Sequence, residues 1–343
     1  MTKIQSFPGS GCKPGRTRGK ILRIGALSLS AFILLGATGQ GLEGQSDPGR
    51  LALDCGADAS QTLGSLCAQS ALAAHILQGG VGLLVGAGGA LPVSPSTAGQ
   101  RMEGAPRVVV DGGLNVGRVE HLDLLSSGST ARSTTSTLLA GRITATAGVF
   151  EGFSPAPTVG GMGSVDGVVT LRFVRFPSGA GFSGTSASVG AGARLGLLRE
   201  SFSLPGVTLT ALHHRPGTIR YGNLEESGRR VVLKPRVTTA RLEVGKDLLA
   251  LGATGGVGFD RMSGRARIAV EANGEGANAG PVSMTQTRRF VFGGINYTWL
   301  VTQISGEVSW SPGQDLPDDF WPREAVSLED GNLQAAITFR IIY

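Results

Sequence analysis

The feature that most constrains this chain is a period-two alternation of apolar and polar side chains that runs from Arg107 to the last residue. In the segment 300–310, for example, Ile304 and Val308 fall on one face, and Ser305 and Glu307 fall on the other. Successive side chains of a strand point to opposite faces of a sheet. Segments of about ten residues with one oily and one polar face are therefore typical of strands that cross a membrane in a closed barrel.

The alternation predicts an all-β fold, a closed antiparallel transmembrane β-barrel over residues 107–343. An even number of strands brings both ends of such a barrel to the periplasmic side. Taking Thr218–Gly222 as one further strand, we expect twelve strands, with ten or fourteen as alternatives. The longest polar links, 119–136, 274–284 and 312–331, are then expected on the outer side. The eleven clear segments are 107–118, 137–149, 163–175, 185–198, 205–214, 236–246, 248–260, 264–273, 285–298, 300–310 and 332–343.

A secreted β-sandwich also shows alternation and is the alternative fold. Composition suits many short strands rather than helices, because the chain has 55 glycines and only 16% charged residues. Aromatic residues also gather near segment ends, as the interfacial girdles of a membrane barrel would. These residues, which favour the barrel, are Phe173, Phe259, Tyr297, Trp299 and Trp310.

Residues 1–39 have the pattern of a secretory signal peptide. Six Lys and Arg residues in the first 23 positions precede a short apolar core, 24–39, that ends in small residues. A single transmembrane anchor is the alternative, but a spanning helix needs about 20 apolar residues. The whole chain has a net charge of +6, and the basic residues of this segment account for most of it, so the remainder is nearly balanced. The net charge therefore does not indicate a nucleic-acid partner.

Residues 40–106 form a separate N-terminal segment. Apolar residues at helical spacing predict a helix at 58–78, followed by a Gly-rich stretch. This segment either lies in the periplasm or folds back into the pore as a plug, and the spacing does not distinguish the two. Its two cysteines, Cys55 and Cys67, are an even number in an exported chain and predict a disulfide, with free thiols as the alternative.

The chain ends on Tyr343, preceded at alternate positions by Ile341, Phe339 and Ile337. This strand resembles the C-terminal assembly signal of bacterial outer-membrane proteins of the porin-like class. The resemblance implies the bacterial outer membrane as the location, with its lipid and the barrel assembly machinery as partners. The helical, Gly-rich segment ahead of the barrel resembles the plug of FadL-type transporters of hydrophobic compounds, although that family's Asn-Pro-Ala motif is missing near the N-terminus.

If the apolar faces point to lipid, the opposite faces line the lumen. Arginines outnumber acidic residues there by eight to four, so we expect a net positive interior. This arrangement fits a pore that favours anions, or equally Arg and Glu pairs that fill a narrow lumen. The candidate lumen-lining residues are Arg107, Asp111, Arg142, Arg172, Arg194, Arg241, Glu243, Arg265, Arg267, Glu271, Glu307 and Arg340.

The pattern predicts a passive or plug-gated channel for small solutes, hydrophobic or anionic, whose identity the sequence does not give. The alternative is a structural or surface-binding barrel with a filled lumen. A barrel hydrolase is a distant third hypothesis, because His213 and His214 are adjacent and point to opposite faces of a strand. We therefore expect no enzyme activity, no cofactor and no metal site.

The terminal aromatic residue yields a first prediction. Tyr343→Ala should lower the amount of barrel assembled into the outer membrane, because the assembly machinery reads the last strand. The stability of the barrel that does assemble should change little, since one residue at a strand end contributes few contacts. Quantifying heat-modifiable barrel in outer-membrane fractions checks this, and normal insertion of the variant would contradict the assignment.

Overall fold

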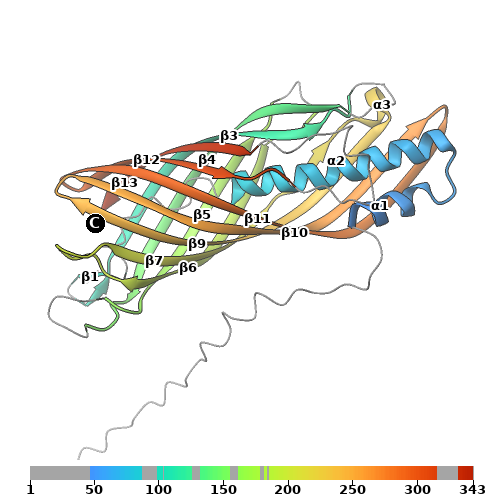
Figure 1. Ribbon diagram of the computed structural model, residues 1–343. Helices are drawn as coiled ribbons and strands as arrows, with labels where there is room; N and C mark the ends of the chain where they lie inside the picture. Colours follow the sequence, from blue (N-terminus) through green and yellow to red (C-terminus); the bar gives the residue numbers. More distant parts are fainter. Residues whose placement is uncertain are drawn as a thin grey trace, which may run out of the picture. The chain divides into compact units, whose positions relative to one another are not determined.

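A computed structural model describes residues 47–86, 99–102, 104–125, 132–154, 161–177, 181–183, 185–314 and 331–342. The expected signal peptide, 1–39, and the terminal Tyr343 lie outside these residues. Ten antiparallel strands close into a ring in the order β3-β4-β5-β6-β7-β9-β10-β11-β12-β13, with β13 pairing back to β3 (Figure 1). The closed antiparallel barrel is thus confirmed, and the β-sandwich alternative is wrong.

The ring strands are β3 (Val108–Leu122), β4 (Ser133–Phe150), β5 (Ser164–Arg175), β6 (Thr185–Leu198), β7 (Gly206–Pro216), β9 (Arg229–Leu248), β10 (Leu251–Ala272), β11 (Glu275–Trp299), β12 (Thr302–Ser311) and β13 (Asn332–Ile342). The remaining elements are α1 (Asp47–Gly56), α2 (Gln61–Val85), the small hairpin of β1 (Arg101–Met102) and β2 (Ala105–Pro106), β8 (Ile219–Tyr221) and α3 (Leu224–Ser227).

The strand number is ten, one of the expected alternatives to twelve. The segments 248–260 and 264–273 belong to one continuous strand, β10, which pairs with β9 and β11 along its length. The further strand expected at Thr218–Gly222 exists as β8, but it pairs with the outer part of β9 and forms one bridge to Phe182, and it does not enter the ring.

The expected outer loop at 274–284 is instead part of β11. Asn273 and Gly274 form a two-residue turn between β10 and β11, with Ala272 opposite Glu275. Their φ angles of 53° and 79° are those of the turn type that Asn-Gly favours in hairpins. The two strands therefore run on as a long hairpin of 22 and 25 residues.

One end of the barrel has the features of a periplasmic end. The ring begins at Val108 and finishes at Ile342 there, and the two-residue turns Leu249–Ala250 and Leu300–Val301 lie at the same end. Most connections at the opposite, outer end are longer than these turns, as in outer-membrane barrels, although the β10–β11 turn there also has two residues. In the half nearer the periplasm, apolar side chains point outward and are exposed, among them Leu114 (60%), Ile143 (52%) and Ile295 (70%).

In the outer half the chemistry of the two faces is exchanged. On β9 and β10 the outward positions carry Lys234 and Arg265, which are exposed, while Leu233 and Ile268 are buried inside the barrel. The strands continue without a break, so the exchange marks where the outward face leaves hydrocarbon. An apolar core inside the outer half replaces the polar interior found nearer the periplasm.

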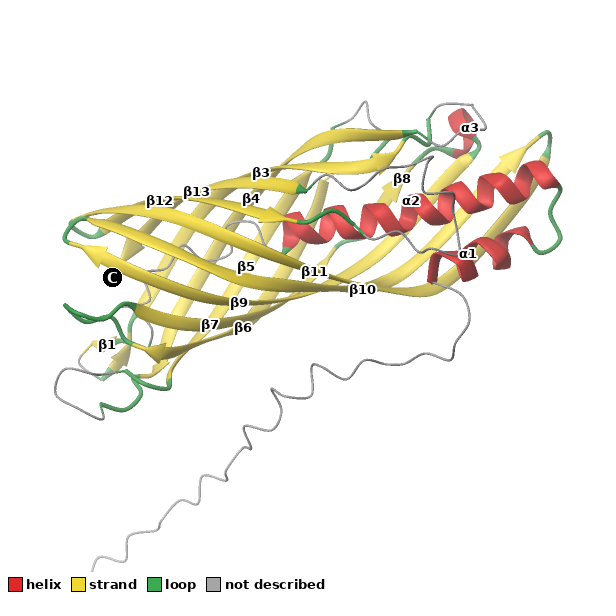
Figure 2. Cartoon of the chain, viewed as in Figure 1, coloured by secondary structure: helices red, strands yellow, loops and turns green. Residues whose placement is uncertain are grey.

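Helix α2 fills that apolar interior. Figure 2 shows it running lengthwise among the strands from the outer end, and it packs against β3, β9, β10 and β11. Residues 69–82 and 84–86 are all buried. Of the two expected positions for the N-terminal segment, α2 therefore occupies the lumen. No helix in the described part of the chain is both long and apolar enough to cross a membrane.

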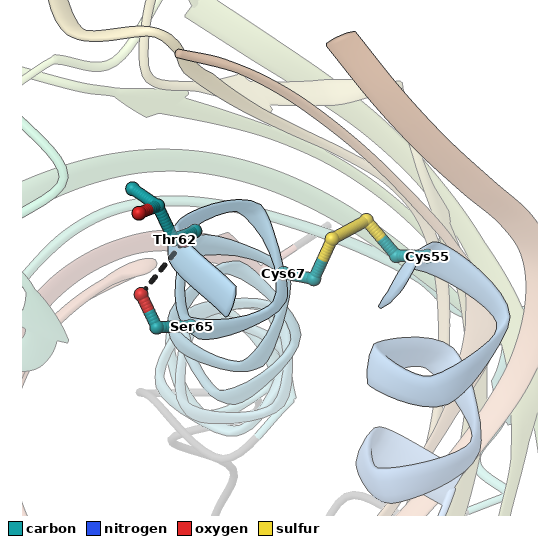
Figure 3. The surroundings of a disulfide bond; sticks show 4 residues. All are labelled: Cys55, Thr62, Ser65 and Cys67. Atoms are coloured by element: carbon teal, nitrogen blue, oxygen red, sulfur yellow. Dashed lines mark hydrogen bonds between the residues drawn. A yellow bond between two sulfur atoms is a disulfide. The ribbon is translucent and has the colours of Figure 1, made fainter. Parts of the chain in front are cut away.

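Helix α1 closes the outer end beside α2. It packs on α2 and β11, and the Asp47 carboxylate accepts a hydrogen bond from the Thr285 backbone N–H at 3.0 Å. The expected disulfide between Cys55 and Cys67 is confirmed, and it joins α1 to α2 (Figure 3). Because α1 is tied to the wall and to α2, the two helices form one unit at the outer end.

Glycines let α2 come close to the barrel wall. The sequence predicts a helix that ends at residue 78, yet α2 continues through Gly79, Gly80 and Gly82 to Val85. A Cβ at Gly80 would overlap the side chain of Val119, which is fully buried. Packing against the wall thus overrides the weak helix propensity of glycine. The face of α2 that meets Val119 can approach the wall only because its residues have no Cβ atom.

Seating of α2 can be tested at this contact. Gly80→Leu should lower the stability of the barrel in detergent by about 1–3 kcal/mol, because Val119 is β-branched and has little room to move. Gly64→Leu is the matched control on the same helix, since nothing lies within 4 Å of a Cβ there. Both changes raise helix propensity equally, so the difference in thermal unfolding isolates the clash. Equal stability of the two variants would contradict the packing described.

Candidate functional site in the barrel interior

Buried ion pairs line the lumen in the half nearer the periplasm. The Arg142 guanidinium lies 3.2 Å from the Asp111 carboxylate on the neighbouring strand. Arg194 pairs in the same way with Asp166. Each of these side chains is at most 3% exposed. The alternating strands place them inward, and cross-strand pairing brings opposite charges together.

Arg241 is the centre of the largest of these clusters. Its guanidinium lies 2.8 Å from Glu307 on β12 and 3.7 Å from Glu243 on its own strand. Glu307 comes from a strand that does not pair with β9, so this contact reaches across the lumen. The guanidinium also stacks on the Phe292 ring, with 3.7 Å between Cζ and the ring centroid. One cation thus bridges two carboxylates and an aromatic face in a site without solvent.

Two other arginines hold the inner end of α2. Arg172 donates to the Leu84 carbonyl at 3.0 Å, and Arg288 donates to the Gly79 carbonyl at 3.4 Å. The Leu84 carbonyl lies in the last turn of α2, where carbonyls lack partners within the helix and carry its partial negative charge, so Arg172 satisfies the helix end. Arg288 contacts the helix more than one turn earlier, and the two guanidinium groups together hold this part of α2 against β5 and β11.

Eight of the twelve predicted lumen-lining residues lie buried inside the barrel. Arg107 is half-buried just before β3 and donates to Gln100. Arg265, Arg267 and Glu271 lie exposed on the outward face of β10, because the faces exchange chemistry in the outer half. The eight interior residues are Asp111, Arg142, Arg172, Arg194, Arg241, Glu243, Glu307 and Arg340.

Sequence reasoning missed further interior charges. Asp166, Asp260, Arg229 and Arg288 are buried, and each falls on the inward positions of its strand, so a full count along each strand would have found them. With them, seven arginines face five carboxylates among the buried residues that the structure describes. Arginines still outnumber carboxylates in the interior, by two rather than by the expected four, and the charges are largely engaged with one another or with α2.

The histidines do not assemble a catalytic site from the expected pair. His213 is exposed and His214 is buried, on opposite faces of β7. His121 at the outer end forms a different contact: its Nε2 lies 2.8 Å from the Ser136 hydroxyl and its Nδ1 lies 2.8 Å from the Tyr221 hydroxyl. Phe182 packs on both rings, so this cluster joins β3, β4 and β8.

The described residues contain no group of three or more His, Cys, Asp or Glu side chains placed to hold a metal ion. Nothing in this part of the chain therefore indicates a metal centre, and the interior is built from arginines, carboxylates and hydroxyls.

A closed antiparallel ring with an outward apolar band and a polar interior defines the transmembrane β-barrel of bacterial outer membranes. The chain is a protein of this class, and its location is the bacterial outer membrane. No sequence-family model and no characterised protein matches the sequence.

Solved structures with a similar arrangement are outer-membrane barrels. The translocator domain of the autotransporter NalP from Neisseria meningitidis is 10% identical, with a TM-score of 0.45, and the match covers 79% of this chain and 97% of that one. The outer membrane protease OmpT from Escherichia coli is 9% identical, with a TM-score of 0.34 and coverage of 71% and 99%. The toluene transporter TodX from P. putida is 9% identical, with a TM-score of 0.27 and coverage of 73% and 92%.

The Arg241 cluster can be tested by a double-mutant cycle. Arg241→Leu should destabilise the barrel by about 3–5 kcal/mol, because it leaves Glu243 and Glu307 buried without their cation. The double variant Arg241→Leu/Glu307→Leu should be less destabilised than the sum of the two single changes. Thermal unfolding in detergent measures all three variants. Additive losses would show that the two side chains do not interact.

Proposed function

We propose that this protein is a sealed outer-membrane barrel that acts through its outer surface, as a surface-binding or structural barrel. The observation that supports the proposal most is the burial of α2 inside the lumen over residues 69–82 and 84–86. The helix packs against β3, β9, β10 and β11, so it occupies space that an open pore would need. In this arrangement the barrel anchors an ordered outer end in the membrane.

The free energy needed to withdraw α2 from the lumen supports a permanent seal. Five of its large side chains are at most 1% exposed, and burying each contributes about 1.5–3 kcal/mol, so withdrawal into water would cost on the order of 10 kcal/mol. That cost corresponds to roughly one open molecule in ten million at equilibrium. The side chains are Leu72, Ile76, Leu77, Val81 and Leu84.

The ion pairs make the lumen below the helix unfavourable for anions. Arg142, Arg194 and Arg241 are engaged with carboxylates there, and Arg340 donates to Gln303 at 3.0 Å. An anion entering this layer would have to compete with carboxylates that already hold the guanidinium groups. The layer therefore favours the filled lumen over an anion-selective pore.

The extended outer end supports a role at the cell surface. Strands of about 9–11 residues suffice to cross a bilayer, whereas β9, β10 and β11 have 20, 22 and 25 residues. The extra length carries α1, α3 and β8 beyond the apolar band. An ordered platform of this kind offers a large surface for contacts outside the cell.

A channel gated by α2 is the second candidate. It is favoured by one observation: the inner end of α2 is held by hydrogen bonds from Arg172 and Arg288, which can be broken without cutting a covalent bond. Such a gate needs a partner that supplies the free energy of withdrawing the helix, because thermal motion alone does not.

Conductance in planar bilayers tests the seal. The refolded full chain should give no steady current, and deletion of residues 47–86 should give a stable open conductance. Leu77→Asp should also produce openings, because it places a carboxylate in the apolar core around α2. Leu53→Asp is the matched control, since Leu53 is 53% exposed on α1. A steady current through the unmodified protein would overturn the sealed barrel, and a silent deletion variant would show that α2 is not the seal.

A further inference from the structure

A basic groove lies on the outward face of the barrel, away from the lumen. It has a volume of about 610 Å³ and crosses β7, β9, β10 and β11. Its charged members are all cations, Arg215, Lys234, Arg236 and Arg265, and no acidic side chain lines it among the described residues. Four hydroxyl groups add further hydrogen-bond donors, and prolines, glycines and Met284 make up the rest of the lining. The hydroxyls belong to Thr218, Ser263, Ser283 and Thr285.

The cations of this groove repel one another without compensation. Lys234 is paired directly opposite Arg265 on the neighbouring strand, and Arg236 lies opposite Ser263. Like charges directly opposite destabilise a sheet. In the described part of the chain, none of the four cations takes part in an ion pair. A bound anion would offset the repulsion among these four cations, which no side chain of the described residues offsets.

The position of the groove relative to the bilayer indicates which kind of anion it can meet. On β10 the outward apolar band ends at Phe259, and Ser263 and Arg265 follow within six residues on the outer side. At about 3.3 Å per residue and a strand tilt near 45°, the groove begins about 9 Å beyond the hydrocarbon. The headgroup layer is about 5–7 Å deep on each side of a bilayer, so the groove begins just beyond its outer edge, and the long arginine and lysine side chains can reach back to the headgroups.

We propose that this groove binds the phosphate groups of a phosphorylated glycolipid in the outer leaflet. Arginine matches a phosphate well, because its planar guanidinium donates two parallel hydrogen bonds to two oxygens. Three arginines from three strands and one lysine can surround a headgroup that carries two phosphates. The acyl chains of the same lipid would then lie along the apolar band directly below, over Leu242 and Val257.

Binding by the refolded full chain in detergent tests the proposal, with bisphosphorylated lipid A as the probe. The variant Arg215→Gln/Arg236→Gln/Arg265→Gln should bind at least about tenfold more weakly, since each arginine contributes charge-assisted hydrogen bonds. The matched control is Arg118→Gln/Arg175→Gln/Arg220→Gln, which removes the same charge from exposed positions outside the groove. It should change the affinity by less than about twofold.

Two further arms identify the ligand. Lipid A stripped of its phosphates should bind poorly, and inorganic phosphate should bind far more weakly than the lipid. Equal loss of affinity in both triple variants, strong binding of the stripped lipid, or equally tight binding of inorganic phosphate would each overturn the proposal. Heat-modifiable migration in gels reports folding of each variant. If the triple variant fails to fold, Arg236→Lys serves instead, because it keeps the charge but loses the paired donors and should still weaken binding several-fold.

Discussion

Closure of the backbone hydrogen bonds around the ring is the constraint on which the rest of this structure depends. Hydrocarbon offers no partner to an unpaired N–H or C=O, so a strand can cross a membrane only when both of its edges are paired. The pairing of β13 with β3 completes that condition. Once the ring is closed, outward side chains meet lipid and inward ones must find partners in a narrow interior, which is why arginines and carboxylates pair there.

The length of the strands then divides the interior into two parts. Nearer the periplasm the outward face is oily and the interior is ionic; beyond the bilayer the outward face is charged and the interior is oily. Helix α2 belongs to the second part, where it supplies the apolar partner that the inward leucines, isoleucines and methionines need. Arg172 and Arg288 stand at the boundary and join the two parts by binding the end of the helix.

The class of fold could be predicted from the sequence because the period of two is preserved along every strand. The predictions that were wrong lie in the outer half, where the apolar positions of the pattern face the interior instead of lipid. Arg265 and Arg267 were assigned to the lumen on the assumption that apolar faces always meet lipid, whereas Ile268 on the same strand faces α2. The same exchange made β10 look like two strands. The Asn273–Gly274 turn is a local signal that could have corrected the expected loop at 274–284, but contacts across the lumen, such as Arg241 with Glu307, join strands that no local pattern connects.

The route of the chain through the barrel constrains its biogenesis. Helix α2 starts at the outer end, while Gly99 already donates a hydrogen bond to Asp166 at the periplasmic end. Helix α2 and Gly99 therefore both contact the inner face of a ring formed by later strands. The disulfide Cys55–Cys67 joins α2, which lies inside the ring, to α1 at its outer end. We therefore expect the pairing of β13 with β3 to close the barrel around α2 during assembly.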